Sequence, residues 1–370
     1  MSASSSPSSS PSSSPSTSPS PSSSPSTIGV LVMAHGTPAT PEEIDPFYTS
    51  IRRGRPPTPE LLADLVRRYD ALGGTSPLAE RTRRQVAGLA ADLEAAAPGA
   101  YTIAYGAKHT SPRIEEGVAT LHDQHVGEII GLVLTPHQSS RGSGEYLRRA
   151  AEAAAATAPP TDFVAIPSWH RAPGFAPLLA ARTAAALDRL TPAQRQKTAV
   201  FFTAHSLPEK ALVERDPYPD QVRQSASDIA GLLGFETATP GTEGTSSTSD
   251  GTSGTSAISG TGDANDTSGT GAEWSVAWQS PGRTADPWMG PDLLSEIKRV
   301  AADGATSVVV CPVGFVSDHL EILYDLDIEA AGLARSLGVA FTRTASLNDD
   351  PAFLRVLADV VRTAAASTDG

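Results

Sequence analysis

Short apolar runs alternate along the chain with longer segments in which apolar residues recur every three or four positions. The short runs are rich in β-branched residues and have the length of buried strands, at 28–34, 101–105, 128–135, 162–166, 198–203, 274–278 and 307–312. The longer segments are typical of amphipathic helices, at 59–72, 78–97, 146–156, 175–190, 218–233, 291–303 and 351–366. Because strands alternate with helices, the pattern predicts an α/β protein with parallel sheets and helices on both faces.

Two segments interrupt this alternation. Residues 1–26 are almost entirely Ser, Pro and Thr, and residues 237–273 are rich in Gly, Ser, Thr and Asp. Neither has enough apolar side chains to offset the entropy lost on ordering, so we expect a disordered tail and a disordered insertion. The remaining length predicts two Rossmann-like α/β domains, 27–170 and 171–345, followed by a C-terminal helix and tail, 346–370.

Charge and cysteine content narrow the possible functions. With 28 Lys and Arg against 41 Asp and Glu, the formal net charge of −13 argues against general binding to nucleic acid or anionic membranes. The apolar runs are far shorter than the roughly 20 residues that cross a bilayer, and the tail lacks a signal or transit pattern. The single cysteine, Cys311, cannot form an internal disulfide, a Cys-ligated iron–sulfur cluster or a Cys-based zinc site. We therefore expect a cytoplasmic protein in which Cys311 is a buried strand residue.

Histidines mark the ends of the predicted strands. Five of the eight follow directly on a strand: His35, His109, His137, His205 and His319. Each one alone is more simply explained as a loop or helix cap. Because parallel sheets bind ligands just beyond the carboxyl ends of their strands, the five together predict an active-site cleft.

Acidic residues follow the last of these histidines. A strand and a glycine-containing turn lead into a predicted helix with Asp318 as its N-cap and with His319 and Glu321 in its first turn, facing the cleft. On a helix, Glu321, Asp325 and Glu329 are spaced to form one acidic stripe. The stripe is either a solvated face or a site where a divalent cation relieves the repulsion, and the flanking apolar residues favour the cation.

An arginine cluster near the first strand has the opposite charge. Arg52, Arg53 and Arg55 lie in IRRGRPP, and Arg67 and Arg68 follow on the next predicted helix. Guanidinium groups bind carboxylates through paired hydrogen bonds, so the cluster predicts an anionic ligand, with a routine solvated patch as the alternative.

These residues lie in a series of longer motifs. In order, the motifs are LVMAHGTP, YTSIRRGRP, LGGTSPLAERT, YGAKHTSPRIEEGV, TAHSLPEK, DPYPDQV, WQSPGRTADPWMGPD and VCPVGFVSDHLEILYDLDIE. With them the chain resembles the ferrochelatases, most closely the coproporphyrin type of Gram-positive bacteria, over residues 28–365 apart from the insertion. The resemblance implies a type II chelatase-like fold.

The resemblance also implies roles for individual residues. His205 and Glu321 match the catalytic pair that binds iron and removes the pyrrole protons. Asp325 and Glu329 match an outer site that can hold a hydrated divalent cation. The positions that match porphyrin-binding residues are Arg52, Arg68, Tyr69, Ser76, Tyr146, Lys108 and His109. His35 stands where Gram-positive relatives carry a tyrosine that approaches the metal; we assign it to porphyrin binding, and imidazole is the better iron ligand.

The implied reaction is the insertion of Fe²⁺ into coproporphyrin III, in haem b biosynthesis, by a monomeric enzyme. We expect His205 to be neutral for much of the physiological pH range, so that it can accept a pyrrole proton. Fe²⁺ is a substrate, and no organic cofactor or iron–sulfur cluster is expected, since the chain has no nucleotide-binding glycine motif. The alternatives are a chelatase for another tetrapyrrole or metal, a non-catalytic haem carrier with His35 as axial ligand, and, last, a two-domain solute-binding protein.

Overall fold

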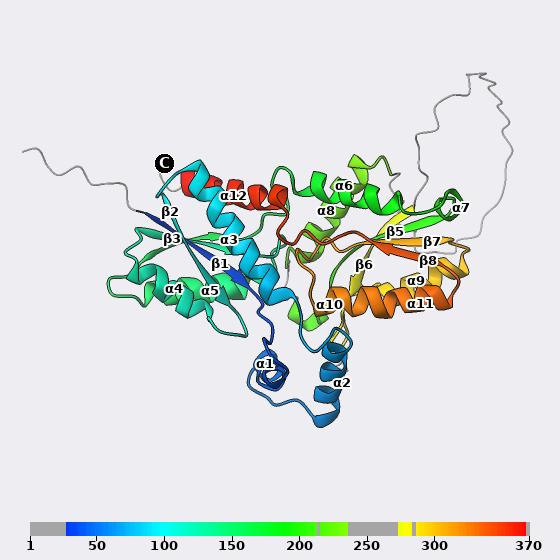
Figure 1. Cartoon of the computed structure of the whole chain (residues 1–370), viewed down its shortest axis with the longest axis horizontal. Coiled ribbons are helices and arrows are strands. Elements are labelled where there is room, and N and C mark those ends of the chain that lie inside the picture. Colours follow the sequence, from blue (N-terminus) through cyan, green and yellow to red (C-terminus); the bar gives the residue numbers. More distant parts are fainter. Residues whose placement is uncertain (1–26, 213–214, 236–272, 283–285, 368–370) are drawn as a thin grey trace, which may run out of the picture.

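Two parallel four-stranded sheets form the framework of the structure, a computed structural model that describes residues 27–212, 215–235, 273–282 and 286–367. The first sheet has the order β2 (Tyr101–Ala107), β1 (Ile28–Ala34), β3 (Glu128–Val133) and β4 (Asp162–Ile166). The second has the order β6 (Glu273–Gln279), β5 (Thr198–His205), β7 (Ser307–Cys311) and β8 (Ala340–Arg343). Every neighbouring pair is parallel, and both sheets use the same strand order. Figure 1 shows the two sheets side by side. This confirms the predicted fold class of two Rossmann-like halves.

Helices cover both faces of each sheet. The first sheet packs against α4 (Ile114–Asp123) and α5 (Ser143–Ala155) on one face, and against α3 (Leu78–Ala96) and α12 (Pro351–Ala366) on the other. The second sheet packs against α6 (Phe175–Leu187) and α8 (Tyr218–Leu232) on one face, and against α9 (Leu293–Ala302) and α11 (Ala331–Ser336) on the other. The last helix of the chain, α12, therefore lies on the first sheet.

The described residues contain further helices. They are α1 (Ile44–Ile51), α2 (Pro59–Asp70), α7 (Pro192–Arg195), α10 (Leu320–Leu323), a π-helix (Asp325–Ala330) between α10 and α11, and the 3₁₀ helices Pro41–Glu43 and Glu209–Ala211. Within the described residues, no helix is long and apolar enough to cross a membrane.

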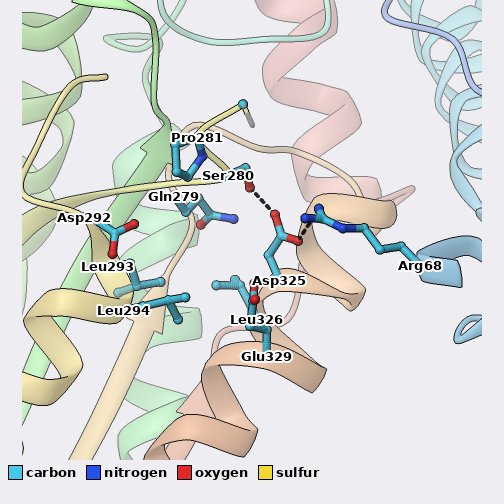
Figure 2. A pocket seen from close by; sticks show the side chains of 11 residues that line it. Arg68, Gln279, Ser280, Pro281, Asp292, Leu293, Leu294, Asp325, Leu326 and Glu329 are labelled. Atoms are coloured by element: carbon cyan, nitrogen blue, oxygen red, sulfur yellow. Dashed lines mark hydrogen bonds and ion pairs between the residues drawn. The ribbon is translucent and has the colours of Figure 1, made fainter. Parts of the chain in front are cut away.

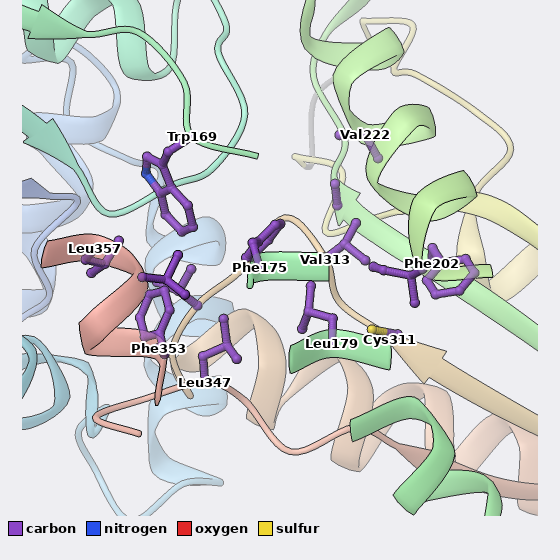
Figure 3. Packing of buried hydrophobic residues seen from close by; sticks show 14 of the residues in the cluster. Trp169, Phe175, Leu179, Phe202, Val222, Cys311, Val313, Leu347, Phe353 and Leu357 are labelled. Atoms are coloured by element: carbon purple, nitrogen blue, oxygen red, sulfur yellow. The ribbon is translucent and has the colours of Figure 1, made fainter. Parts of the chain in front are cut away.

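One apolar cluster joins the two halves (Figure 3). It contains Val30 of β1 and Val200 of β5, and the ring of Trp169 links its two parts. The Trp169 ring centroid lies 5.1 Å from that of Phe175, which begins α6, and 5.8 Å from that of Phe353 in α12. All five side chains are buried, so α6 and α12 are anchored at the junction between the sheets.

The sequence pattern missed the strand β8 and the helices α1, α4 and α7, the last only four residues long. β8 has only four residues, all half-buried at the sheet edge, so it shows no apolar run. The short helix α1 contains Pro46, and α4 contains Gly117, a weak helix former. A Cβ on Gly117 would lie 2.6 Å from Leu31 Cδ1, so α4 can pack closely on β1 only with glycine at this position. The same glycine weakens the helical pattern in the sequence.

Other predictions need smaller corrections. β4 was expected to be a buried strand, but it is an edge strand and most of its side chains are half-buried or exposed. Cys311 ends β7 and is fully buried, as predicted. The tail 1–26 and the insertion 237–273 lie outside the described residues, except for Glu273, which begins β6. The domain boundaries near residues 170 and 345 stay predictions.

Strand order determines where a ligand can bind. In the first sheet, β2 lies on one side of β1 and β3 on the other. In the second sheet, β6 lies on one side of β5 and β7 on the other, so the chain changes direction at β1 and at β5. The crevice at such a switch point, beyond the carboxyl ends of the strands, is the usual ligand site of parallel sheets. The residues that follow β1, β3, β5 and β7 are therefore placed to form one.

Candidate active site

The residues beyond these strand ends line two adjoining cavities between the sheets. The Tyr146 cavity has a volume of about 350 Å³ and the Tyr69 cavity a volume of about 270 Å³. The two share five lining residues, which are His35, Leu78, His205, His319 and Glu321. Because the shared residues come from both halves of the molecule, the two cavities form one continuous cleft.

A histidine and a carboxylate face each other in the shared part of the cleft. His205 is the last residue of β5, and Glu321 lies in α10, just after β7. His205 Nε2 lies 3.4 Å from Glu321 Oε1, and His319 Nε2 lies 3.5 Å from Glu321 Oε2. The side chains of His205 and Glu321 are each about one-third exposed, so a ligand in the cleft can reach both.

Their charges are coupled. Burial alone lowers the pKa of His205, but the Glu321 carboxylate and the Ser206 carbonyl outweigh it and raise this pKa to about 9. Burial likewise raises the pKa of Glu321, but His205 and His319 hold it well below its usual value. The expectation that His205 is neutral at physiological pH is therefore wrong, because Glu321 stabilises the imidazolium.

Two side chains that the sequence analysis missed position this pair. Gln279 ends β6; its Nε2 donates to the Glu321 carbonyl at 3.1 Å, and its Oε1 accepts from the Thr203 hydroxyl at 2.6 Å. The Tyr218 hydroxyl donates to the His205 carbonyl at 3.0 Å. Gln279 also follows a strand, so the rule used for the histidines could have identified it.

His35 lines both cavities from the first half. Its ring centroid lies 4.7 Å from that of His109, and burial lowers the pKa of His35 to about 4, so its imidazole is neutral at pH 7. Gly36 has φ of 84°, and a Cβ there would lie 2.3 Å from Thr110 Oγ1, so only glycine permits this turn. His109 packs behind His35, bonds Ser50 Oγ through Nδ1 at 3.0 Å, and lines neither cavity of the cleft.

The predicted tetrapyrrole residues divide between the two cavities. Tyr69, Ser76 and Arg68 line the Tyr69 cavity, whereas Tyr146 and Lys108 line the Tyr146 cavity. Burial raises the pKa of Tyr69 to about 12, so this phenol is neutral. Arg52 lines neither cavity; its guanidinium carbon lies 5.7 Å from the centroid of the Tyr48 ring, which does line the Tyr69 cavity.

The predicted acidic stripe is interrupted by an arginine. Asp325 accepts a hydrogen bond from the Ser280 hydroxyl. It also forms an ion pair with Arg68, whose Nη1 lies 3.5 Å from Asp325 Oδ1 (Figure 2). Arg68 Nε also lies 3.3 Å from Asp64 Oδ2. Burial, followed by the charge of Glu321, raises the pKa of Asp325 to about 6. Asp325 and Glu329 both line a side cavity of about 280 Å³ next to the cleft.

The helix that carries the stripe also differs from the prediction. Asp318 is not an N-cap; its carboxylate accepts hydrogen bonds from Arg343, Ser346 and Asn348, and His319 occupies the cap position. The Asp325–Ala330 segment is a π-helix, a form that is often found at functional sites. In the described residues, no group of three or more His, Cys, Asp or Glu side chains is arranged to hold a metal ion. The outer cation site stays a prediction.

Comparison with known proteins identifies the family. The ferrochelatase family profile matches residues 27–365. This chain belongs to the ferrochelatase family. It is 36% identical to a ferrochelatase from Herpetosiphon aurantiacus, over 90% of this chain and 97% of that one. It is 37% identical to coproporphyrin III ferrochelatase 1 from Bacillus cereus, over 90% of this chain and 96% of that one.

Solved structures share the fold of this ferrochelatase. SirB from Bacillus subtilis with Fe³⁺ aligns with a TM-score of 0.52 and 12% identity, over 93% of this chain and 98% of that one. Its likeness extends to the architecture alone. As a ferrochelatase, this chain is a lyase that inserts a metal into a porphyrin; its substrates are a porphyrin and Fe²⁺, and no organic cofactor is implied.

Proposed function

We propose that this ferrochelatase acts on coproporphyrin III and forms its iron complex as a step in haem b biosynthesis. The supporting observation is that the His205 and Glu321 pair lies at the meeting point of two cavities that each have a cationic side chain. Relatives with 35–37% identity from Bacillus, Anoxybacillus and Geobacillus are named coproporphyrin III ferrochelatases, whereas those from Herpetosiphon and Thermus are named ferrochelatases. The names of the relatives therefore do not determine which porphyrin is the substrate, and the proposal depends on the charges in the cleft.

Metal insertion is a proton exchange. The free porphyrin carries two N–H protons, and Fe²⁺ replaces both, so two protons leave for each iron that enters. Because Glu321 keeps the imidazole of His205 protonated at neutral pH, His205 must first lose its own proton. A dication arriving beside Glu321 opposes the positive imidazolium and lowers its pKa, which prepares His205 to accept a pyrrole proton.

The cleft also acts on the macrocycle. A flat porphyrin directs its nitrogen lone pairs inward, so iron enters slowly unless the ring is puckered. Contacts to the edge substituents in both cavities supply binding energy for that distortion. His35, which is neutral, faces the same shared part of the cleft and is the candidate ligand on the side of the first sheet.

The remaining expectations belong to the same proposal. Asp325 and Glu329 are candidates for holding a hydrated divalent cation in the side cavity that they line, while Arg68 offsets part of their charge. The proposal also includes a monomeric state and a cytoplasmic location.

An anaerobic assay tests the choice of substrate. Purified protein is given Fe²⁺ with either coproporphyrin III or protoporphyrin IX, and the metalloporphyrin product is followed by absorbance. A higher kcat/KM for coproporphyrin III supports the proposal. A preference for protoporphyrin IX contradicts it, and turnover only with another tetrapyrrole or metal favours the alternative chelatase.

A further inference from the structure

A cationic side chain lines each of the two cavities of the cleft, so each cavity suits an anionic group of the ligand. A macrocycle whose nitrogens face His205 and Glu321 extends its edge substituents into both the Tyr146 cavity and the Tyr69 cavity, since these residues line both. Coproporphyrin III carries one propionate on each of its four pyrroles, so carboxylates reach both cavities. Protoporphyrin IX carries two propionates on adjacent pyrroles, so one of the cavities receives only apolar substituents.

The cations that line the two cavities are not equally available. Arg68, in the Tyr69 cavity, already faces Asp64 and Asp325. Lys108, in the Tyr146 cavity, already donates to Glu145 at 2.9 Å. In the described part of the chain, the guanidinium of Arg141, in the Tyr146 cavity, makes no ion pair or hydrogen bond. Arg141 is thus the uncompensated cation of the cleft in a protein of net charge −13.

The surroundings of Arg141 suit a carboxylate. Lys108 Nζ donates to the Arg141 carbonyl at 3.4 Å, so Lys108 lies beside the backbone of Arg141, and both residues line the Tyr146 cavity. Ser139 and Ser143 line the same wall, and Ser143 begins α5. Lys108 lies over the Tyr146 ring, with Nζ 5.0 Å from the ring centroid, so an apolar surface adjoins the cations. This combination matches a propionate at the edge of a porphyrin ring.

We propose that Arg141 pairs with a propionate in the Tyr146 cavity and that protoporphyrin IX directs its two propionates into the Tyr69 cavity, so that Arg141 acts as a specificity residue for coproporphyrin III. The inference rests on the proposed function and assigns part of its selectivity to one side chain. Arg141 lies at the cavity wall and takes no part in proton transfer, so its loss weakens binding and leaves the chemistry of the His205 and Glu321 pair intact.

A binding experiment without iron tests Arg141 directly. Porphyrin Kd is measured by quenching of tryptophan fluorescence in the full-length wild type and in Arg141→Gln, at low and high salt. We expect Arg141→Gln to weaken coproporphyrin III binding by about 3- to 10-fold at low salt, and protoporphyrin IX binding by less than about 2-fold. The salt dependence of the coproporphyrin III Kd should decrease, because one ionic contact is lost. Arg141→Lys should recover part of the affinity.

A matched control lies on α5, the helix that begins two residues after Arg141. Arg148 pairs with Glu152 at 2.7 Å and lines neither cavity, so Arg148→Gln should leave both Kd values unchanged. Equal losses for the two porphyrins in Arg141→Gln, or no loss, would overturn the inference. Iron-free binding separates the two proposals: if the wild type binds coproporphyrin III through Arg141 but does not insert iron into it, only the proposed function fails.

Discussion

His205 Nε2 and Glu321 Oε1 lie 3.4 Å apart; His205 ends strand β5, and Glu321 lies in the helix α10 that comes after strand β7 of the same sheet. The raised pKa of His205 and the lowered pKa of Glu321 make the pair an imidazolium beside a carboxylate at neutral pH. His205 must therefore lose a proton before it can accept one from a pyrrole nitrogen.

Removing either member of the pair should abolish fast metal insertion. We expect His205→Ala and Glu321→Gln each to lower kcat by roughly two orders of magnitude or more, while porphyrin Kd changes little. The reason is that the proton acceptor is lost but the contacts at the porphyrin edge remain. Anaerobic kinetics and fluorescence titration give the two quantities. Near-normal kcat in both variants would refute the site assignment.

The charge of His205 should depend on Glu321. In the wild type, the His205 pKa of about 9 should be visible in the pH titration of its imidazole NMR signals. In Glu321→Gln the raising partner is gone and burial lowers the pKa, so the midpoint should fall below about 6.5. Because the folded pKa of His205 is raised and that of Glu321 is lowered, the pair stabilises the fold fully between about pH 4.5 and 6.5. The contribution is lost as pH rises through about 9, and also as pH falls through the lowered pKa of Glu321. An unchanged midpoint would show that Glu321 is not the cause.

Asp325 should reduce stability at neutral pH. Its folded pKa of about 6 lies above the unfolded value, so ionisation of this buried carboxyl costs free energy once pH exceeds both values. We expect Asp325→Asn, which keeps an acceptor for Ser280, to have a higher Tm than the wild type at pH 7. The difference should shrink as pH falls towards 4. A constant difference across that range would contradict the raised pKa.

Phe353 should be essential for the junction between the two sheets. Its side chain is fully buried and its ring centroid lies 5.8 Å from that of Trp169. Phe353→Ala should lower the free energy of unfolding by about 3 to 5 kcal/mol, measured by urea denaturation. Arg355→Ala, an exposed position on the same helix, is the control and should change it by less than about 0.5 kcal/mol. Similar losses of unfolding free energy in the two variants would show that Phe353 does not hold the junction together.

Propionate contacts should make substrate choice depend on salt. If each exposed carboxylate–guanidinium contact contributes about 0.5 to 1 kcal/mol, two extra contacts favour coproporphyrin III by roughly 5- to 30-fold. High ionic strength should lower kcat/KM for coproporphyrin III more than for protoporphyrin IX. Equal losses for the two porphyrins would refute the charge argument and leave the chelatase activity unaffected.

Local patterns predicted the parts of the site that depend on sequence neighbours. His205 was found because it comes at the carboxyl end of an apolar run, and Glu321 because it lies in the first turn of the predicted helix after the last such run. The resemblance to the ferrochelatases then made the two a catalytic pair. The charge of His205 could not be predicted in this way, because it depends on Glu321, a carboxylate far along the chain that only folding brings within 3.4 Å. The same holds for Arg68: its helix and sign are evident in the sequence, but its pairing with Asp325 is not.

The C-terminal helix α12 has a consequence for how the protein is made. It covers part of the first sheet together with α3, although that sheet is assembled from strands in the first half of the chain. During synthesis the first half therefore leaves the ribosome with part of an apolar face uncovered, beside α3, until α12 emerges. Such exposed surfaces attract chaperones and other unfinished chains. A cell that stops translation early would release a fragment prone to aggregation, and not a half-sized porphyrin binder.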